Sequence, residues 1–166
     1  MFNLNDKIMY ASVGVCSIDE ITEKDLGQGT VQYYVLRPLY QKASTVFVPT
    51  NNEILLSRMS NILSKKELLS LLEKIPLEED IWLENSNDRK MRFREILSGT
   101  DRHDILSLIR AVITHKKYLE DNGKKLHLSD ERYFKEAAAV AYGEISLVLD
   151  MEIENIPEYL EKTLCR

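Results

Sequence analysis

The first 58 residues alternate short apolar runs with turn residues, a pattern that is typical of β-structure. β-branched and aromatic residues favour strands, and they gather in four runs, at residues 8–10, 13–18, 31–37 and 45–48. Gly27 and Gly29 mark a turn between the second and third runs, and Pro49 closes the fourth. Several short strands at this spacing predict a small barrel or a strongly bent sheet.

From Ser64 onward the apolar residues recur at helical spacing. Ser64 and Glu67 have the spacing of a capping box, which predicts a helix that Pro76 ends. Its apolar stripe consists of Leu68, Leu71, Leu72 and Ile75. Similar stripes predict helices at about residues 88–98, 101–120 and 129–149, and a short one after Pro157. We therefore expect an α+β fold, with a β domain at residues 1–58 and an all-helical domain at residues 59–166.

The composition is that of an ordinary globular protein of 166 residues, with 44% apolar and 30% charged residues. No apolar run is long enough to span a bilayer, and the N-terminus has no signal-peptide pattern, so we expect a cytoplasmic protein with no membrane partner. Cys16 and Cys165 lie at opposite ends of the chain and the three His residues are scattered, which gives no zinc-binding spacing. We expect no metal, no cofactor and no small-molecule ligand.

Common catalytic motifs are missing from the sequence, which has no GxSxG, P-loop, HExxH or GxGxxG. Asp101, His103 and Asp104 come nearest to an acid/base group. They stand at a predicted helix start, where capping and the helix dipole account for both Asp residues. The sequence therefore argues against an enzyme.

The distribution of charge is more informative than the formal net charge of −5. Lys and Arg outnumber Asp and Glu by 12 to 7 in residues 89–135, whereas they are outnumbered by 3 to 7 in residues 59–88 and by 2 to 7 in residues 136–166. Affinity for bare duplex DNA depends on the number of phosphate contacts, so such a protein should bind DNA weakly by itself. If it contacts DNA, we expect another partner to deliver it there.

One short segment combines the only Trp of the chain, Trp82, with four nearby cations. These are Arg89, Lys90, Arg92 and Arg94, at the start of a helix for which Asn87 or Asp88 would be the N-cap. Cations in a first helical turn oppose the helix dipole, so their placement favours an anion such as phosphate. An aromatic side chain beside a phosphate site suits an exposed base or base step. The alternatives are a solvated basic face and a Trp that anchors the core.

Several stretches of the sequence resemble the polymerase-interacting domain of the CarD/CdnL transcription regulators, which is shared with the transcription-repair coupling factor. They are DKIMY at residues 6–10, Gly14-Val15, QYYVL at residues 32–36 and VFVP at residues 46–49. The resemblance continues through Trp82, FREIL at residues 93–97, Ser98-Gly99, HKK at residues 115–117 and residues 137–149. The sequence differs from the family at Ala11, where the family often has Pro, and at Lys24, where Arg is common.

The resemblance implies a non-catalytic regulator of bacterial transcription initiation, associated with the nucleoid through RNA polymerase. A Tudor-like barrel would bind the β subunit of RNA polymerase through Lys24, Tyr33, Val35, Arg37, Phe47 and Pro49. The helical domain would contact promoter DNA at the upstream edge of the melted bubble. There Trp82 would enter the minor groove and slow collapse of the bubble, while Arg89, Lys90, Arg92 and Arg94 hold the DNA backbone.

A second interpretation stays open on the residues alone. The chain would be an adaptor, whose β domain binds polymerase or another protein and whose helical domain binds a protein in place of DNA. Acidic residues on both sides of Trp82, at positions 78–80 and 84, weigh against its contact with DNA. An exposed Trp82 beside a basic surface would favour the DNA-binding regulator, and a Trp82 buried under acidic residues would favour the adaptor.

Overall fold

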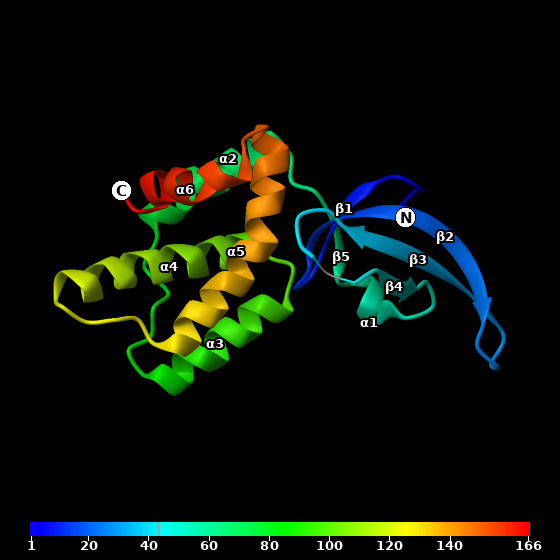
Figure 1. The fold of residues 1–166 in the computed structure, drawn as a ribbon, viewed down its shortest axis with the longest axis horizontal. Coiled ribbons are helices and arrows are strands. Elements are labelled where there is room, and N and C mark those ends of the chain that lie inside the picture. The colour runs from blue at the N-terminus through cyan, green and yellow to red at the C-terminus, as the bar shows by residue number, and fades with distance from the viewer. Residues whose placement is uncertain (43) are drawn as a thin grey trace.

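The computed structural model describes residues 1–42 and 44–166, and it has the expected α+β order of a β domain followed by helices (Figure 1). The sheet contains β1 (Lys7–Tyr10), β2 (Gly14–Asp25), β3 (Thr30–Pro38), β4 (Val46–Pro49) and β5 (Met59–Asn61), with the short helix α1 (Glu53–Leu56) before β5. The helical part contains α2 (Lys65–Lys74), η1 (Ile75–Leu77), α3 (Ser86–Ser98), α4 (Arg102–Asp121), α5 (Leu128–Leu149), η2 (Ile153–Asn155) and α6 (Ile156–Leu164). Within the described residues, no helix is both long and apolar enough to cross a membrane.

The sheet is antiparallel, with the strand order β4-β3-β2-β1-β5. The edge strands β4 and β5 are not paired with each other in the described part of the chain, so the sheet is open and does not form the closed barrel that was one of the two predicted forms. β2 runs seven residues beyond Ile18, the predicted end, because a bulge between Ile18 and Glu20 lets it continue along β3. The resulting β2–β3 hairpin points away from the helices (Figure 1).

The two faces of the sheet contribute to two different cores. Ile8 and Cys16 point to one side, where the α1 residues Leu55 and Leu56 cover the sheet. Met9, the residue between Ile8 and Tyr10 on β1, points to the other side and joins the core of the helical part. Because side chains alternate along a strand, β1 thereby connects the small sheet core to the large helical core.

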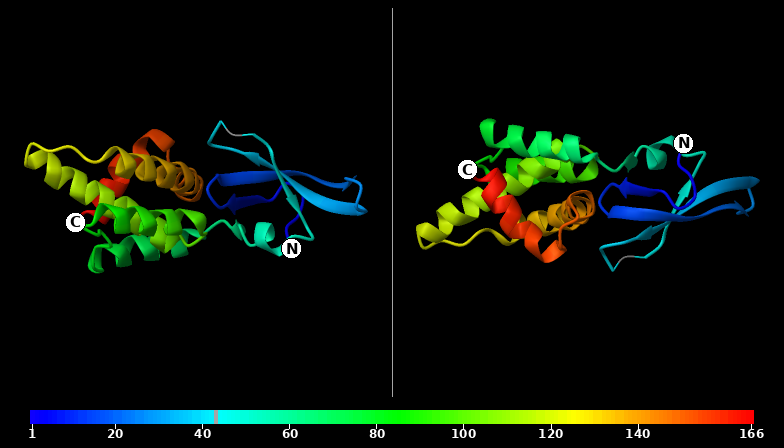
Figure 2. Two further views of the ribbon diagram at one scale, coloured as in Figure 1. Left: turned by 90° about the horizontal axis from the view of Figure 1, so that it is seen from below. Right: turned by 90° about the horizontal axis from the view of Figure 1, so that it is seen from above.

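Helix α5 lies directly against the sheet. Gly143 on α5 packs under the ring of Tyr40, where an added Cβ would come within 2.6 Å of the Tyr40 Cδ2 atom. The side chain of Gln41 donates a hydrogen bond of 2.8 Å to the carbonyl oxygen of Ala139 on α5, and it also contacts the carbonyl of Val13. The sheet and the helices form the two ends of one elongated body (Figure 2).

A nearly buried ion pair between Arg102 of α4 and Glu144 of α5 holds the junction. The guanidinium lies 3.0 Å from the carboxylate, and it donates further bonds of 2.8 Å to the Ser60 hydroxyl and the Asn61 carbonyl on β5. Glu144 also accepts a bond from the Leu63 amide. β5 extends the sheet to Asn61, three residues past the boundary expected after Arg58, because its three residues pair with β1.

We predict that Glu144→Ala lowers the free energy of unfolding by about 3–5 kcal/mol, because Arg102 would keep its buried charge without a partner. Urea unfolding measures this loss. Glu158→Ala is the matched control, since it removes only an exposed surface pair with Lys162 and should leave the stability close to that of the unchanged chain. Equal stability of the two variants would contradict the prediction.

Candidate functional site

Trp82 lies in the segment between η1 and α3, and its side chain is partly buried. Its indole stacks on the imidazole of His115, with ring centroids 4.0 Å apart and planes 10° apart. It also meets the edge of Phe93 at 6.3 Å, and its backbone N–H donates to the Asp80 carboxylate at 2.8 Å. Trp82 is therefore neither a freely exposed ring nor a fully buried one, but a ring that packs against the helical core.

Arg89 is buried, with 3% of its surface exposed, and all of its contacts are internal. Its Nε and Nη2 atoms donate to both carboxylate oxygens of Asp130, at 2.9 and 2.7 Å. Its Nη1 donates to the carbonyl oxygens of Leu83 and Glu84, and its Cζ atom lies 4.2 Å from the centroid of a Trp82 ring. These contacts do not support Arg89 as a DNA ligand. Arg89 instead holds the segment that carries Trp82 against α3 and α5.

The start of α3 differs from the prediction, and the difference removes one argument for an anion site. The helix begins at Ser86, and its N-cap is Asn85, whose side chain accepts from the Asn87 and Asp88 amides. The predicted cap at Asn87 or Asp88 was wrong, because all four residues from Asn85 to Asp88 are of types that cap helices, and the sequence does not show which of them does so. Asp88 therefore occupies the first turn, as the helix dipole favours, and the four cations come after it.

The other three cations of the segment remain accessible to different degrees. Arg94 is exposed and donates to the Tyr133 hydroxyl at 3.3 Å, and this hydrogen bond is the largest contribution that lowers the pKa of Tyr133. Arg92 is partly exposed and lies 3.7 Å from the Glu95 carboxylate, and Lys90 is partly exposed on the same helix. These three side chains, and not Arg89, are the cations of α3 that a phosphate can reach.

The strand register brings all six residues expected to bind polymerase to one face of the sheet, which we name the outer sheet face. Side chains of alternate residues on β3 share this face, and Phe47 is paired with Val35 while Pro49 is paired with Tyr33. Lys24 joins them from β2, where it is paired with Val31. The face comprises Lys24, Tyr33, Val35, Arg37, Phe47 and Pro49.

Exposure differs among the residues of the outer sheet face. Phe47 is 47% exposed, and the Lys24 ammonium lies 4.1 Å from its ring centroid. Arg37 is exposed and pairs with Asp19 at 2.7 Å; a hydrogen bond from Ser17, followed by the one from Arg37, lowers the pKa of Asp19. Val35 is 8% exposed, so it supports the neighbouring side chains and offers little contact area itself.

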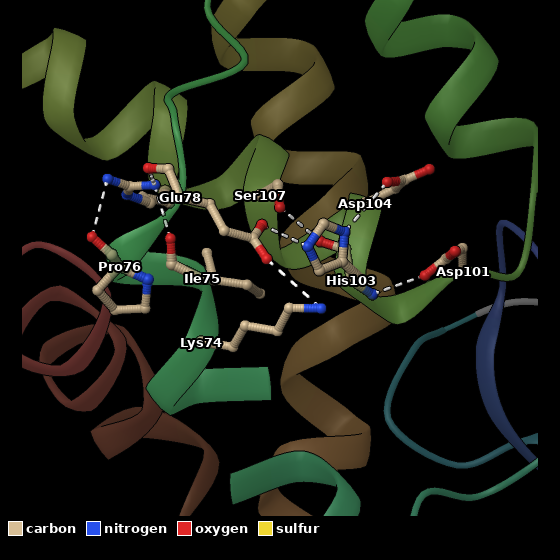
Figure 3. Close-up of polar contacts among 9 residues, drawn as sticks. Lys74, Ile75, Pro76, Glu78, Asp101, His103, Asp104 and Ser107 are labelled. Carbon is tan, nitrogen blue, oxygen red and sulfur yellow. Dashed lines mark hydrogen bonds and ion pairs between the residues drawn. The ribbon is translucent and has the colours of Figure 1, made fainter. Parts of the chain in front are cut away.

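A polar cluster at the start of α4 fastens η1 to that helix (Figure 3). The His103 ring lies 2.6 Å from the Glu78 carboxylate through Nε2 and 3.3 Å from Asp104 through Nδ1. Asp101 caps the helix by accepting from the His103 amide, as the sequence predicts. Asp101, His103 and Asp104 could each offer a ligand atom to a metal ion, but their atoms already serve the cap and the two ring contacts.

Comparison with known families gives one finding for this chain. Residues 2–60 match the family model described as the CarD-like/TRCF RID domain. The match covers β1 to β4 and reaches into β5, so it includes the whole outer sheet face but not the Trp82 segment. No curated protein matches the chain.

Substitution of the neighbouring cations Arg89 and Lys90 tests which cations of α3 stabilise the fold. We predict that Arg89→Ala lowers the free energy of unfolding by about 3–5 kcal/mol, since Asp130 would be left buried and unpaired. Lys90→Ala, the control on the same helix, should cost less than about 0.5 kcal/mol. Chemical denaturation followed by circular dichroism measures both, and an Arg89→Ala protein as stable as Lys90→Ala would show that the pair is dispensable.

The two histidines should titrate on opposite sides of their ordinary pKa of 6.5. Burial opposes protonation of His103, but its hydrogen bonds to Glu78 and Asp104 outweigh this and raise its pKa. Burial lowers the pKa of His115, and the carboxylates of Asp80 and Glu84 offset only part of that effect. NMR titration of the imidazole C–H signals measures both values, and the reverse order would contradict the described contacts.

Linkage gives the sign of the effect on stability. The contribution of His103 is complete below pH 6.5 and is lost as the pH rises through its higher, folded-state pKa. The contribution of His115 is complete above pH 6.5 and is lost as the pH falls through its lower, folded-state pKa. Glu78→Gln serves as the control, because it should lower the pKa of His103 and leave that of His115 in place.

Proposed function

We propose that this chain, whose residues 2–60 match the CarD-like/TRCF RID domain, interacts with RNA polymerase and regulates transcription initiation without catalysis. In this proposal the sheet binds the β subunit of RNA polymerase, and the helical part contacts promoter DNA at the upstream edge of the melted bubble. The observation that carries the proposal is the outer sheet face, which lies wholly inside the matched domain.

The outer sheet face has the chemistry of a protein interface. Exposed aromatic and Arg side chains dominate the energetics of such interfaces, and here Phe47 and Arg37 stand on adjacent strands. The face also borders β4, an edge strand with backbone groups available to a partner strand. A polymerase subunit could therefore gain both side-chain and main-chain contacts at this place.

The DNA contact is assigned to α3 and the segment before it. Lys90, Arg92 and Arg94 supply cations for the DNA backbone, and Trp82 supplies the aromatic edge that meets the unstacked base step. A net charge of −5 favours delivery by polymerase over binding to free DNA. In this arrangement the protein acts only at promoters that polymerase already occupies.

A second candidate function is the protein adaptor, in which the helical part binds another protein. The acidic groups beside Trp82 favour it: Asp80 accepts from the Trp82 backbone, and Glu84 follows two residues later. Negative charge at this position repels phosphate, so its presence must be offset by the cations of α3 if DNA is the partner. The lifetime of promoter open complexes with a Trp82 variant separates the two functions.

We predict that Phe47→Ala weakens retention of the full chain on RNA polymerase about tenfold or more, the loss expected for a central aromatic at an interface. Tyr118→Ala is the matched control, because Tyr118 is an exposed aromatic of the helical part. It should be retained like the unchanged chain. Equal retention of both variants would contradict the assignment of the outer sheet face.

The second arm of this experiment measures the lifetime of promoter open complexes with Trp82→Ala. This variant should still bind polymerase but should no longer lengthen the lifetime of the open complex. It should also lose about 0.5–3 kcal/mol of stability, because the Trp82 ring is partly buried against the core. Leu164→Ala, a change at a buried residue of α6, controls for lost stability. A Trp82→Ala variant that binds polymerase and gives the same open-complex lifetime as the unchanged chain would favour the adaptor.

A further inference from the structure

The imidazole of His115 stacks on the indole of Trp82. It comes from the C-terminal half of α4, whereas Trp82 comes from the segment before α3, and the two rings lie nearly parallel with centroids 4.0 Å apart. Two residues of α3 contact the same indole. The Arg89 Cζ atom lies 4.2 Å from the centroid of a Trp82 ring, and the centroids of the Phe93 and Trp82 rings are 6.3 Å apart. The indole is therefore held by side chains of two helices and does not project alone into solvent.

These contacts limit how the indole can meet DNA. A parallel ring at 4.0 Å leaves no space for a base on the face that it covers, so a base could stack there only if His115 moved away. A base can contact the edge of the indole without any movement of His115. Because its rotamer is already fixed in the folded protein, the indole would lose little conformational freedom when it binds.

We infer that His115 is a positioning residue for Trp82, which holds the indole against α4 so that melted promoter DNA meets it as a rigid edge and not as a plate that stacks between bases. This inference rests on the proposed function. His115 itself contacts no DNA in this account; it acts through the ring that it holds.

The electrostatics of the site agree with this role. Burial lowers the pKa of His115, which keeps the imidazole neutral at neutral pH. A neutral ring can stack on the indole beside the Arg89 guanidinium without repulsion between like charges. Arg89 is itself neutralised by Asp130, so the indole lies between an uncharged ring and a paired cation.

The test uses the full chain and the fluorescence of Trp82, which is the only Trp and therefore the only source of that signal. In the free protein, His115→Ala should lower the fluorescence anisotropy and increase quenching by acrylamide, because the indole becomes mobile. His115→Phe should restore both values, since it replaces one flat ring by another. Lys116→Ala, the exposed neighbour on α4, is the control and should change neither.

The functional readout is the lifetime of promoter open complexes with RNA polymerase. His115→Ala should shorten it about two- to tenfold, the expected cost of ordering one side chain on binding, and His115→Phe should restore it. A longer lifetime with His115→Ala would overturn the inference, because it would mean that His115 masks Trp82. An unchanged lifetime with a mobile indole would also overturn it.

Trp82→Ala in the same assay distinguishes failure of the inference from failure of the proposed function. If Trp82→Ala shortens the lifetime and His115→Ala does not, the inference alone is wrong. If Trp82→Ala leaves the lifetime unchanged, the DNA contact of the proposed function is wrong and the inference falls with it.

Discussion

The nearly buried ion pair between Arg102 and Glu144 is the constraint on which the arrangement of the molecule depends. Its guanidinium bonds to β5 on one side and its carboxylate to the Leu63 amide on the other, so the last strand and the first helices cannot shift independently. Buried charges impose a specific geometry more than they add stability, because their desolvation offsets their attraction. Here the geometry that they impose is the position of the sheet relative to the helices, and hence of the outer sheet face relative to Trp82.

A second buried ion pair, between Arg89 and Asp130, fixes the geometry of its surroundings in the same way. A cation that the sequence places among candidate DNA ligands is used to fold the segment that carries Trp82. Neighbouring cations of α3 therefore differ in what they contact. Arg89 fixes the backbone at Leu83 and Glu84, whereas Lys90, Arg92 and Arg94 face outward to different degrees. In the proposed DNA contact, the Trp82 ring would meet the base step while these three outward cations would meet the DNA backbone.

Periodicity predicts most of this fold, because the helices and the main strands each bury one regular face. It fails where the signal is short or repeated. α1 and β5 are too short for a period to show, and β2 continues past Ile18 through acidic residues that hide the alternation. Alternation also brings the outer sheet face together correctly, since residues two apart on β3 must share a side. The burial of Arg89 was beyond prediction, because its partner Asp130 lies on another helix 41 positions away along the chain.

In the proposed complex, the chain binds polymerase with its outer sheet face and promoter DNA with the edge of Trp82. A cryo-electron microscopy reconstruction of the full chain with RNA polymerase and a melted promoter tests it most directly. We expect Phe47 and Arg37 to contact the β subunit, and the edge of Trp82, still stacked on His115, to contact the upstream end of the bubble. A chain bound to polymerase through its helices, or one with Trp82 turned away from DNA, would contradict it.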